Sequence, residues 1–338
     1  MARTVNLYVV ESRFQALIAL MLARSQPTQE HILFHCLEPI GEFTRQFPFV
    51  RTVHLGARLH RGIWKKPRTL RRWVHCIVTA AQGADTVHYH CANLKTPLLN
   101  YPLAALQRAL PAATVTVNVI TDGTSNFKRR TLSDKALRKL RQRAQQLVPR
   151  LLGLRFTLFN RERFGIDADI VRHIYLLPGA PHEYDAARVM DVPIMDLGLP
   201  AAALNEHSAR ALVIGEKLTD RNWLSLTDEG HIAAQVARLI ADHGIVHVDY
   251  VPHPTATHLD LWQDHYTRVD TRDPIELHMM QHRYTLVCGI ASTALFTARL
   301  LQPDGARTVS VGLTCVTGRN ALAETIGHAF RGMGVECL

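Results

Sequence analysis

The chain has 338 residues, of which 47% are hydrophobic and 20% charged, and its formal net charge at pH 7 is +10. This composition supports an ordinary globular core, and the length is enough for two domains. No apolar run approaches the roughly 20 residues that a membrane-spanning helix requires. The excess of Lys and Arg favours a polyanionic partner: a nucleotide, a nucleic acid, an anionic glycan or an anionic lipid surface.

The N-terminal segment and the cysteines indicate a cellular compartment. The chain reaches Glu11 too soon for the apolar region of a signal peptide. The six cysteines are scattered and form no C-x-x-C pair, which favours reduced and mostly buried thiols. We therefore expect a cytoplasmic protein that begins with a strand.

Strand and helix patterns alternate along both halves of the chain. Apolar β-formers predict strands at 5–10, 32–36, 52–55, 86–90, 114–120, 156–159, 173–177, 211–214, 245–251, 284–290 and 308–313. Helical periodicity predicts helices at 14–23, from about 133 onward, and at 227–243, 294–301 and 321–330. This alternation is typical of the α/β class. Residues 178–208 lose periodicity and are rich in Pro and Gly, so they are the predicted interdomain linker.

Residues 86–90 read T-V-H-Y-H and place His88 and His90 on one face of the predicted strand. With Cys91 they suggest a metal site. No second ligand pair has matching spacing, however, so we predict no metal there.

Three predicted strands end in side chains that could carry chemistry. Residues 114–120 lead into Asp122, which is either a general base or a turn aspartate bonded to its own backbone. Residues 245–251 stop at Pro252-His253-Pro254, where His253 could donate a proton to a phosphate or could lie in a rigid surface loop. Ser292 and Thr293 open a helix, where they would bind phosphate with backbone N–H groups or act as caps.

Four features stand in order along the chain: Thr121-Asp122-Gly123-Thr124, Gly215-Glu216-Lys217-Leu218, His253-Pro254 and Ser292-Thr293. Together they resemble the bacterial sialyltransferases of the GT-B kind, including the lipooligosaccharide and polysialic acid enzymes of glycosyltransferase family 52 or a close relative. The resemblance covers most of the chain. It implies two Rossmann-like domains, an acceptor-side domain of residues 1–190 and a nucleotide-sugar domain of residues 191–338, which face each other across a cleft.

The resemblance also assigns roles to these residues. Asp122 matches the base that takes the proton of the acceptor hydroxyl, and His253 matches the histidine that stabilises the departing phosphate. Ser292 and Thr293 match the hydroxyl pair on that phosphate. Thr121 stands where the family usually has a first acid, which bears on the identity of the acceptor or the donor sugar.

Three more residues complete the nucleotide-binding set that the resemblance implies. Gly215 and Pro254 belong to the matching segments. Glu276, in D-P-I-E-L, resembles a glutamate that holds the nucleoside. The alternative for Glu276 is an exposed glutamate on a helix.

The implied activity is inverting transfer of sialic acid, or a related nonulosonic acid, from a CMP-activated donor to a glycan acceptor of surface lipooligosaccharide or capsule. No cofactor and no metal are expected. One alternative is a GT-B transferase that uses CMP-Kdo, CMP-legionaminic acid or a UDP-hexose. Another is a non-enzymatic protein that binds anionic glycan or nucleic acid, although the chain has no nucleic-acid fingerprint, so we expect no nucleic-acid partner.

Two basic stretches, 58–72 and 128–143, fall in the expected first domain. The first stretch has three interpretations: it stacks on nucleic-acid bases, it anchors on anionic lipid, or it is a solvated helix face. In the resembling enzymes this domain faces the acceptor. We therefore predict that Lys65, Lys66, Arg138 and Lys139 attract an anionic acceptor or the inner membrane surface, which would make the protein peripheral there. A homodimer is left open.

Overall fold

The computed structural model describes residues 2–37, 40, 42–47, 49–56, 65–123, 129–194, 209–269, 273–302, 305–316 and 320–338. Contacts between Cα atoms divide the chain into two compact units. Unit 1 comprises residues up to 122, 128–178 and 182–193, and unit 2 comprises 123–127, 179–181 and 194–338. We expected the boundary at 190–191; the contacts assign Pro193 to unit 1 and Ile194 to unit 2.

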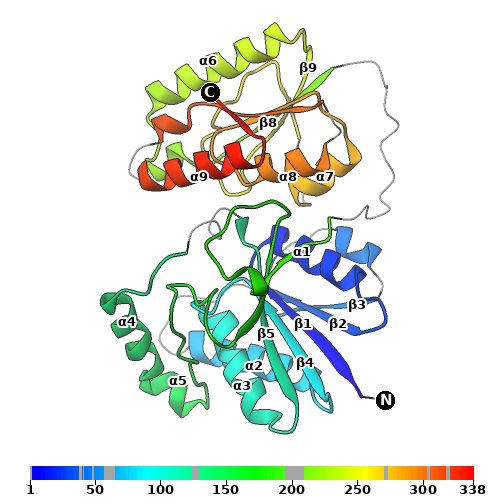
Figure 1. The fold of residues 1–338 in the computed structure, drawn as a ribbon, viewed down its shortest axis with the longest axis vertical. Helices are drawn as coiled ribbons and strands as arrows, with labels where there is room; N and C mark the ends of the chain where they lie inside the picture. The colour runs from blue at the N-terminus through cyan, green and yellow to red at the C-terminus, as the bar shows by residue number, and fades with distance from the viewer. Residues whose placement is uncertain are drawn as a thin grey trace. The chain divides into compact units, whose positions relative to one another are not determined.

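Unit 1 is built on a parallel sheet with the strand order β3-β2-β1-β4-β5-β6-β7 (Figure 1). Its strands and helices, in chain order, are β1 (Thr4–Val10), α1 (Arg13–Arg24), β2 (Glu30–His35), β3 (Val50–His54), α2 (Lys65–Ala80), β4 (Thr86–Cys91), α3 (Pro97–Ala109), β5 (Thr114–Ile120), α4 (Asp134–Ala144), α5 (Leu147–Leu151), β6 (Val171–Leu176) and β7 (Val189–Asp191). The predicted α/β class is confirmed, because apolar parallel strands alternate with helices in this unit.

Residues 156–159 were predicted as a strand, and that prediction is wrong. Phe156 and Phe159 are both buried, but they stand three residues apart, whereas strand alternation places residues two apart on the same face. The backbone of Thr157, however, bonds to a side chain instead of a neighbouring strand. Its N–H donates to Asn100 Oδ1 at 2.7 Å, and its carbonyl accepts from Asn100 Nδ2 at 2.9 Å. The amide of Asn100 therefore satisfies the groups that a strand ladder would otherwise satisfy.

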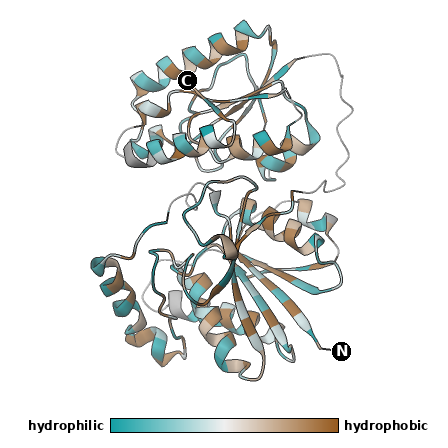
Figure 2. Cartoon of the chain, in the orientation of Figure 1, coloured by the Kyte–Doolittle hydropathy of each residue, from teal (hydrophilic) through white to brown (hydrophobic). Residues whose placement is uncertain are grey.

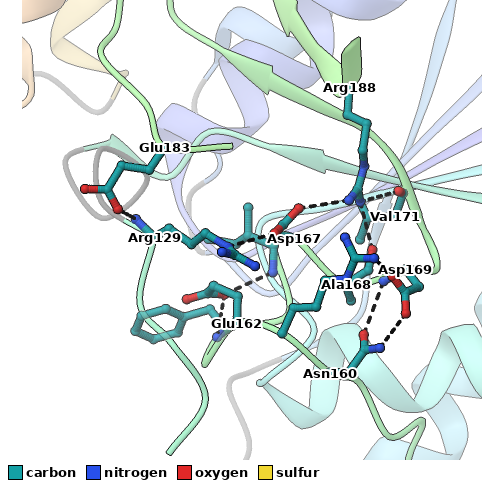
Figure 3. A network of polar contacts seen from close by, with 12 residues as sticks. Arg129, Asn160, Glu162, Asp167, Ala168, Asp169, Val171, Glu183 and Arg188 are labelled. Carbon is teal, nitrogen blue, oxygen red and sulfur yellow. Dashed lines mark hydrogen bonds and ion pairs between the residues drawn. The ribbon is translucent and has the colours of Figure 1, made fainter. Parts of the chain in front are cut away.

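The predicted linker also starts too early. Residues 189–191 form β7, which pairs in parallel with β6 at the edge of the sheet of unit 1. Arg188 anchors this segment, because its Nη1 donates to Asp167 Oδ1 at 2.8 Å and its Nη2 to the carbonyl of Ala168 at 2.8 Å (Figure 3). These long-range contacts hold an aperiodic, proline-containing segment in the sheet.

Unit 2 contains a second parallel sheet, with the order β10-β9-β8-β11-β12-β13. Its elements are β8 (Arg210–Ile214), α6 (Leu226–Asp242), β9 (His247–Val251), β10 (Thr267–Arg268), α7 (Ile275–Gln281), β11 (Leu286–Gly289), α8 (Ala294–Leu301), β12 (Arg307–Ser310), α9 (Asn320–Gly332) and β13 (Glu336–Cys337). Strands β8, β9 and β11 are neighbours in this sheet. Because parallel strands end at the same edge, the segments that follow them lie close together.

Among the described helices, none combines the length and the apolar character that crossing a membrane requires.

Candidate functional site

The candidate residue in unit 1 is Asp122, two residues beyond the end of β5. Its Oδ1 accepts a hydrogen bond of 2.5 Å from Gln15 Nε2 in the first turn of α1. The orientation of the Gln15 amide is fixed, because its Oε1 accepts from the N–H of Glu11 at 2.8 Å. Asp122 is therefore held from α1, while a large part of its surface stays exposed to solvent.

The pKa of Asp122 is raised above its ordinary value, because desolvation by the surrounding protein outweighs the hydrogen bond from Gln15, which acts in the opposite direction. A carboxylate with a raised pKa is a stronger base than an ordinary aspartate. The geometry thus gives Asp122 one fixed oxygen, and its raised pKa suits proton abstraction.

The candidate residues in unit 2 centre on the segment that follows β8. Gly215 lies against the ring of Tyr250 on the neighbouring strand β9. A Cβ atom at position 215 would lie 2.2 Å from the Tyr250 hydroxyl oxygen. Only glycine allows this close approach. The next turn is fixed by Asp260, which is fully buried and whose Oδ2 accepts from the N–H of Leu218 at 2.7 Å.

Glu216 joins this segment to the turn between β11 and α8. The side chain is buried, and its Oε1 accepts from the N–H groups of Ile290 at 2.8 Å and Ala291 at 2.6 Å. Burial raises the pKa of Glu216 to about 7, although the backbone hydrogen bonds act to lower it. We expected the N–H groups of this turn to bind phosphate directly. In the structure two of them are already bonded to Glu216.

Ser292 and Thr293 lie at the start of α8, as predicted. Ser292 Oγ accepts from the N–H of Ala294 at 3.2 Å, which closes a local turn just before the helix. The hydroxyl proton of Ser292 is then the group that can be directed at an anion, since a hydroxyl accepts and donates at once. Thr293 is the residue before the first helical residue and is half-buried.

His253 follows β9 within the predicted proline-flanked loop and is half-buried. Its Nδ1 accepts from the N–H of Thr255 at 3.2 Å. In the neutral ring the proton is then on Nε2, which is a donor. Burial and the nearby cations Arg221 and Lys217 lower the pKa of His253, so the neutral ring is favoured.

Lys217 connects His253 to the same segment as Glu216. Its Nζ donates to the carbonyl of Thr255, the residue whose N–H is bonded to His253. The segment 215–218 therefore contacts both the loop of His253 and the turn of Ser292. Pro254 belongs to this loop and is exposed.

Glu276, in the first turn of α7, is not the exposed glutamate of the alternative interpretation. It is 5% exposed, and its Oε1 accepts from Thr297 Oγ1 of α8 at 3.2 Å. Burial raises its pKa to about 7. Glu276 thus packs against α8, the helix that Ser292 and Thr293 precede.

The structure describes only part of the set of cations that we predicted to attract an anionic acceptor or a membrane surface. Arg138 and Lys139 are exposed on α4. The side chains of Lys65 and Lys66, at the start of α2, lie outside the described residues, as does most of the stretch 58–64. Beside α4 the structure adds an apolar feature, since Leu147 and Leu151 of α5 are 69% and 72% exposed.

A D-x-D triplet, the pattern that can hold a divalent ion on a nucleotide sugar, occurs at Asp167-Ala168-Asp169. Asp167 is paired with Arg129 and Arg188 at 2.8 Å each (Figure 3). Asp169 is paired with Arg161 at 2.7 Å. These cations neutralise the carboxylates that an ion would use. Elsewhere in the described part of the chain, no group of three or more His, Cys, Asp and Glu side chains is arranged to hold a metal.

Sequence reasoning missed Gln15 and did not assign a role to Glu216. Gln15 lies in a helix that otherwise reads as apolar, and it is buried. A single buried polar residue at the start of such a helix is the signal that could have identified it. Glu216 belonged to a segment that we had singled out, but its partners lie more than 70 residues away.

Known structures share this fold. A galactoside alpha-2,3-sialyltransferase from the luminous marine bacterium Photobacterium phosphoreum superposes with a TM-score of 0.61 at 11% identity, over 100% of this chain and 99% of that one. A Staphylococcus aureus MnaA–UDP structure and Acinetobacter baumannii MurG give TM-scores of 0.49 and 0.45 at 11% and 8% identity, covering 100% and 99% of this chain and 92% and 86% of theirs. No protein-family model matches the sequence, and no curated protein does. The chain therefore has the GT-B fold.

Proposed function

We propose that the protein is a glycosyltransferase that moves sialic acid, or a related nonulosonic acid, from a CMP-activated donor to a glycan acceptor of surface lipooligosaccharide or capsule. The observation that carries the proposal is the linked set in unit 2. Glu216 fixes the turn before Ser292, and Lys217 contacts the loop of His253. The likeness in fold to a sialyltransferase supports the same class of reaction.

In this proposal the donor phosphate lies against Ser292 and Thr293. Nε2–H of His253 and the hydroxyl of Ser292 donate to it as negative charge develops on the departing CMP. Preorganised donors of this kind lower a barrier by about 3 kcal/mol each. Asp122 accepts the proton of the acceptor hydroxyl while that oxygen forms the bond to the anomeric carbon. The new bond inverts the configuration of that carbon, and no metal is assigned a role.

The double variant Ser292→Ala/Thr293→Ala tests where the phosphate binds. Losing two hydroxyl donors to a phosphate should weaken CMP binding by about 100-fold, at roughly 1.4 kcal/mol for each hydrogen bond. The measurement is calorimetric titration of CMP, with Ser225→Ala, which caps α6 in the same unit, as the matched control. Equal CMP affinities for the double variant and the wild type would remove the phosphate role.

A second proposal concerns attachment to the inner membrane surface, where a glycolipid acceptor would be found. The exposed cations of α4 and the exposed leucines of α5 are close in sequence, and the two helices are neighbours in Figure 1. Cations contribute on the order of 1 kcal/mol each near an anionic bilayer, and leucines contribute by burial at the headgroup level. Exposed cations and exposed apolar side chains thus occur together on two consecutive helices.

Cosedimentation with vesicles tests this attachment. Wild type should bind vesicles that contain anionic lipid, and binding should weaken as salt shortens the screening length to about 3 Å at 1 M. Arg138→Glu/Lys139→Glu and, separately, Leu147→Gln/Leu151→Gln should each reduce binding without changing CMP affinity. Leu226→Gln, an exposed leucine of unit 2 (65% exposed), is the matched control. Equal binding to zwitterionic and anionic vesicles would contradict the proposal.

A further inference from the structure

A cavity of about 220 Å³ lies on one face of the sheet of unit 1. Its floor is formed by side chains of four neighbouring strands, β1, β4, β5 and β6. Every lining side chain carries a polar group, and they include Asn6, His88, His90, Asn118, Arg172 and His173. The cavity contains neither Asp122 nor any residue of unit 2, so it is separate from the site described above.

Strand alternation explains the polar floor. In β4 the side chains of Val87 and Tyr89 are completely buried, and Tyr89 donates a hydrogen bond to the backbone of α3 on the other face. His88 and His90 alternate with them and therefore point to the face of the cavity. In Figure 2 the strands of this sheet show the same alternation of hydrophilic and hydrophobic colour. The register places His90 beside Asn118, and Asn118 beside His173.

The hydrogen bonds around His90 fix its tautomer. Asn6 Nδ2 donates to Gln29 Oε1 at 2.7 Å, so Asn6 Oδ1 faces His90. That oxygen lies 3.2 Å from His90 Nε2, which must therefore carry the proton. Burial holds the pKa of His90 well below its ordinary value, so the ring stays neutral. His90 Nδ1 is left as a lone-pair acceptor.

Three buried polar atoms at this cavity have no hydrogen-bond partner among the described residues, and one of them is Nδ1 of His173. The other two are acceptors, Nδ1 of His90 and Oδ1 of Asn118, whose side chains are 4% and 3% exposed. A buried acceptor without a donor costs roughly 1–3 kcal/mol. A hydroxyl group of a bound molecule can supply the donor that His90 Nδ1 and Asn118 Oδ1 lack among the described residues. Among the described residues, no three or more His, Cys, Asp and Glu side chains are arranged to hold a metal ion.

We propose that this cavity binds one sugar unit that bears a carboxylate. Sugar hydroxyls donate to His90 Nδ1 and Asn118 Oδ1, and the Arg172 guanidinium pairs with the carboxylate. No Asp or Glu lines the cavity to repel it. The half-buried ring of Tyr175 lines the cavity and offers an apolar face to the sugar ring. The volume is below the roughly 300 Å³ at which drug-sized pockets begin, so it suits a single ring.

The alternative occupant is water, at about 30 Å³ per molecule. Saturation-transfer NMR with glucuronic acid, and with galactose as the neutral probe, separates the two. Wild type should bind glucuronic acid with a dissociation constant of about 1 mM and bind galactose more weakly. Arg172→Ala, an exposed position, should weaken glucuronic acid binding by about tenfold and galactose binding little, as one charge-assisted bond is lost.

His90→Phe keeps the stacking on Tyr8, whose centroid is 4.4 Å away, but removes the ring nitrogens. It should abolish the binding of both sugars. His75→Ala, an exposed histidine of α2, is the matched control and should bind as wild type does. If wild type gives no saturation-transfer NMR signal for either sugar, water alone occupies the cavity and the proposal fails. The proposal also fails if Arg172→Ala binds glucuronic acid as wild type does, a result that stands whether or not His90→Phe folds. Neither readout requires transferase activity.

Discussion

Asp122→Asn should reduce glycosyl transfer by about 10²- to 10⁴-fold, the contribution of a positioned general base. Asparagine keeps an Oδ1 that can accept the hydrogen bond from Gln15 Nε2, so the local geometry should survive. Only the ability to take a proton is lost. CMP affinity should change by less than about twofold, because the base acts on the acceptor and the nucleotide is assigned to unit 2.

The measurement is initial transfer rate at saturating CMP-sialic acid, together with CMP titration of the same preparation. Gln15→Leu gives an independent readout. The hydrogen bond from Gln15 lowers the pKa of Asp122, so its removal should raise that pKa and move the acidic limb of the pH–rate profile to higher pH. If Asp122→Asn keeps more than about a tenth of the turnover, a loss below roughly 1.4 kcal/mol, the assignment of the base is wrong.

Local patterns predicted the strands that position the site. The alternating residues of β5 and the proline block after β9 determine where each strand ends, and they act through nearest neighbours in the chain. His253 and Ser292 could be placed at the sheet edge on that basis alone. Such arguments succeed because a parallel sheet brings the carboxyl ends of its strands together whatever the intervening residues are.

The sequence-based predictions that failed share one physical cause. In each case a polar group has its hydrogen-bond partner far along the chain. Asn100 replaces a strand partner for Thr157, 57 residues away. Arg188 bonds to Asp167 and so holds in the sheet of unit 1 a segment that composition assigned to a linker. Glu216 occupies N–H groups that a helix-start argument assigned to phosphate. No periodicity marks such contacts, since each depends on how the finished fold brings two segments together.

Glu216 should make nucleotide binding depend on pH. Its carboxyl group bonds to residues one and two positions before Ser292, so a phosphate at Ser292 would lie close to it. A nearby negative charge favours the protonated acid and raises its pKa further. Since that pKa is already about 7 without ligand, binding should take up a proton near neutral pH, and affinity should fall as the pH rises above 7.

The size of the change in CMP affinity follows from how far bound phosphate shifts the pKa of Glu216. If bound phosphate raises the pKa by about one unit, CMP affinity falls by about tenfold from pH 6 to pH 9 relative to a variant that cannot titrate. Glu216→Gln is that variant, because its amide oxygen can still accept from Ile290 and Ala291. CMP itself also titrates in this range. The decisive quantity is therefore the ratio of the two dissociation constants at each pH, in which the titration of the ligand cancels.

The free energy of unfolding provides a second, independent test of the raised pKa of Glu216. The folded protein keeps a proton on Glu216 that the unfolded chain releases near pH 4.5, so the free energy of unfolding should fall as the pH rises from about 4.5 to about 7. Glu276 has the same raised pKa but bonds to Thr297 instead of the turn. Glu216→Gln and Glu276→Gln should both flatten the profile of stability against pH in urea titrations, whereas only Glu216→Gln should remove the pH dependence of CMP affinity. If the ratio of the CMP dissociation constants of wild type and Glu216→Gln stays constant from pH 6 to pH 9, the phosphate does not bind beside Glu216.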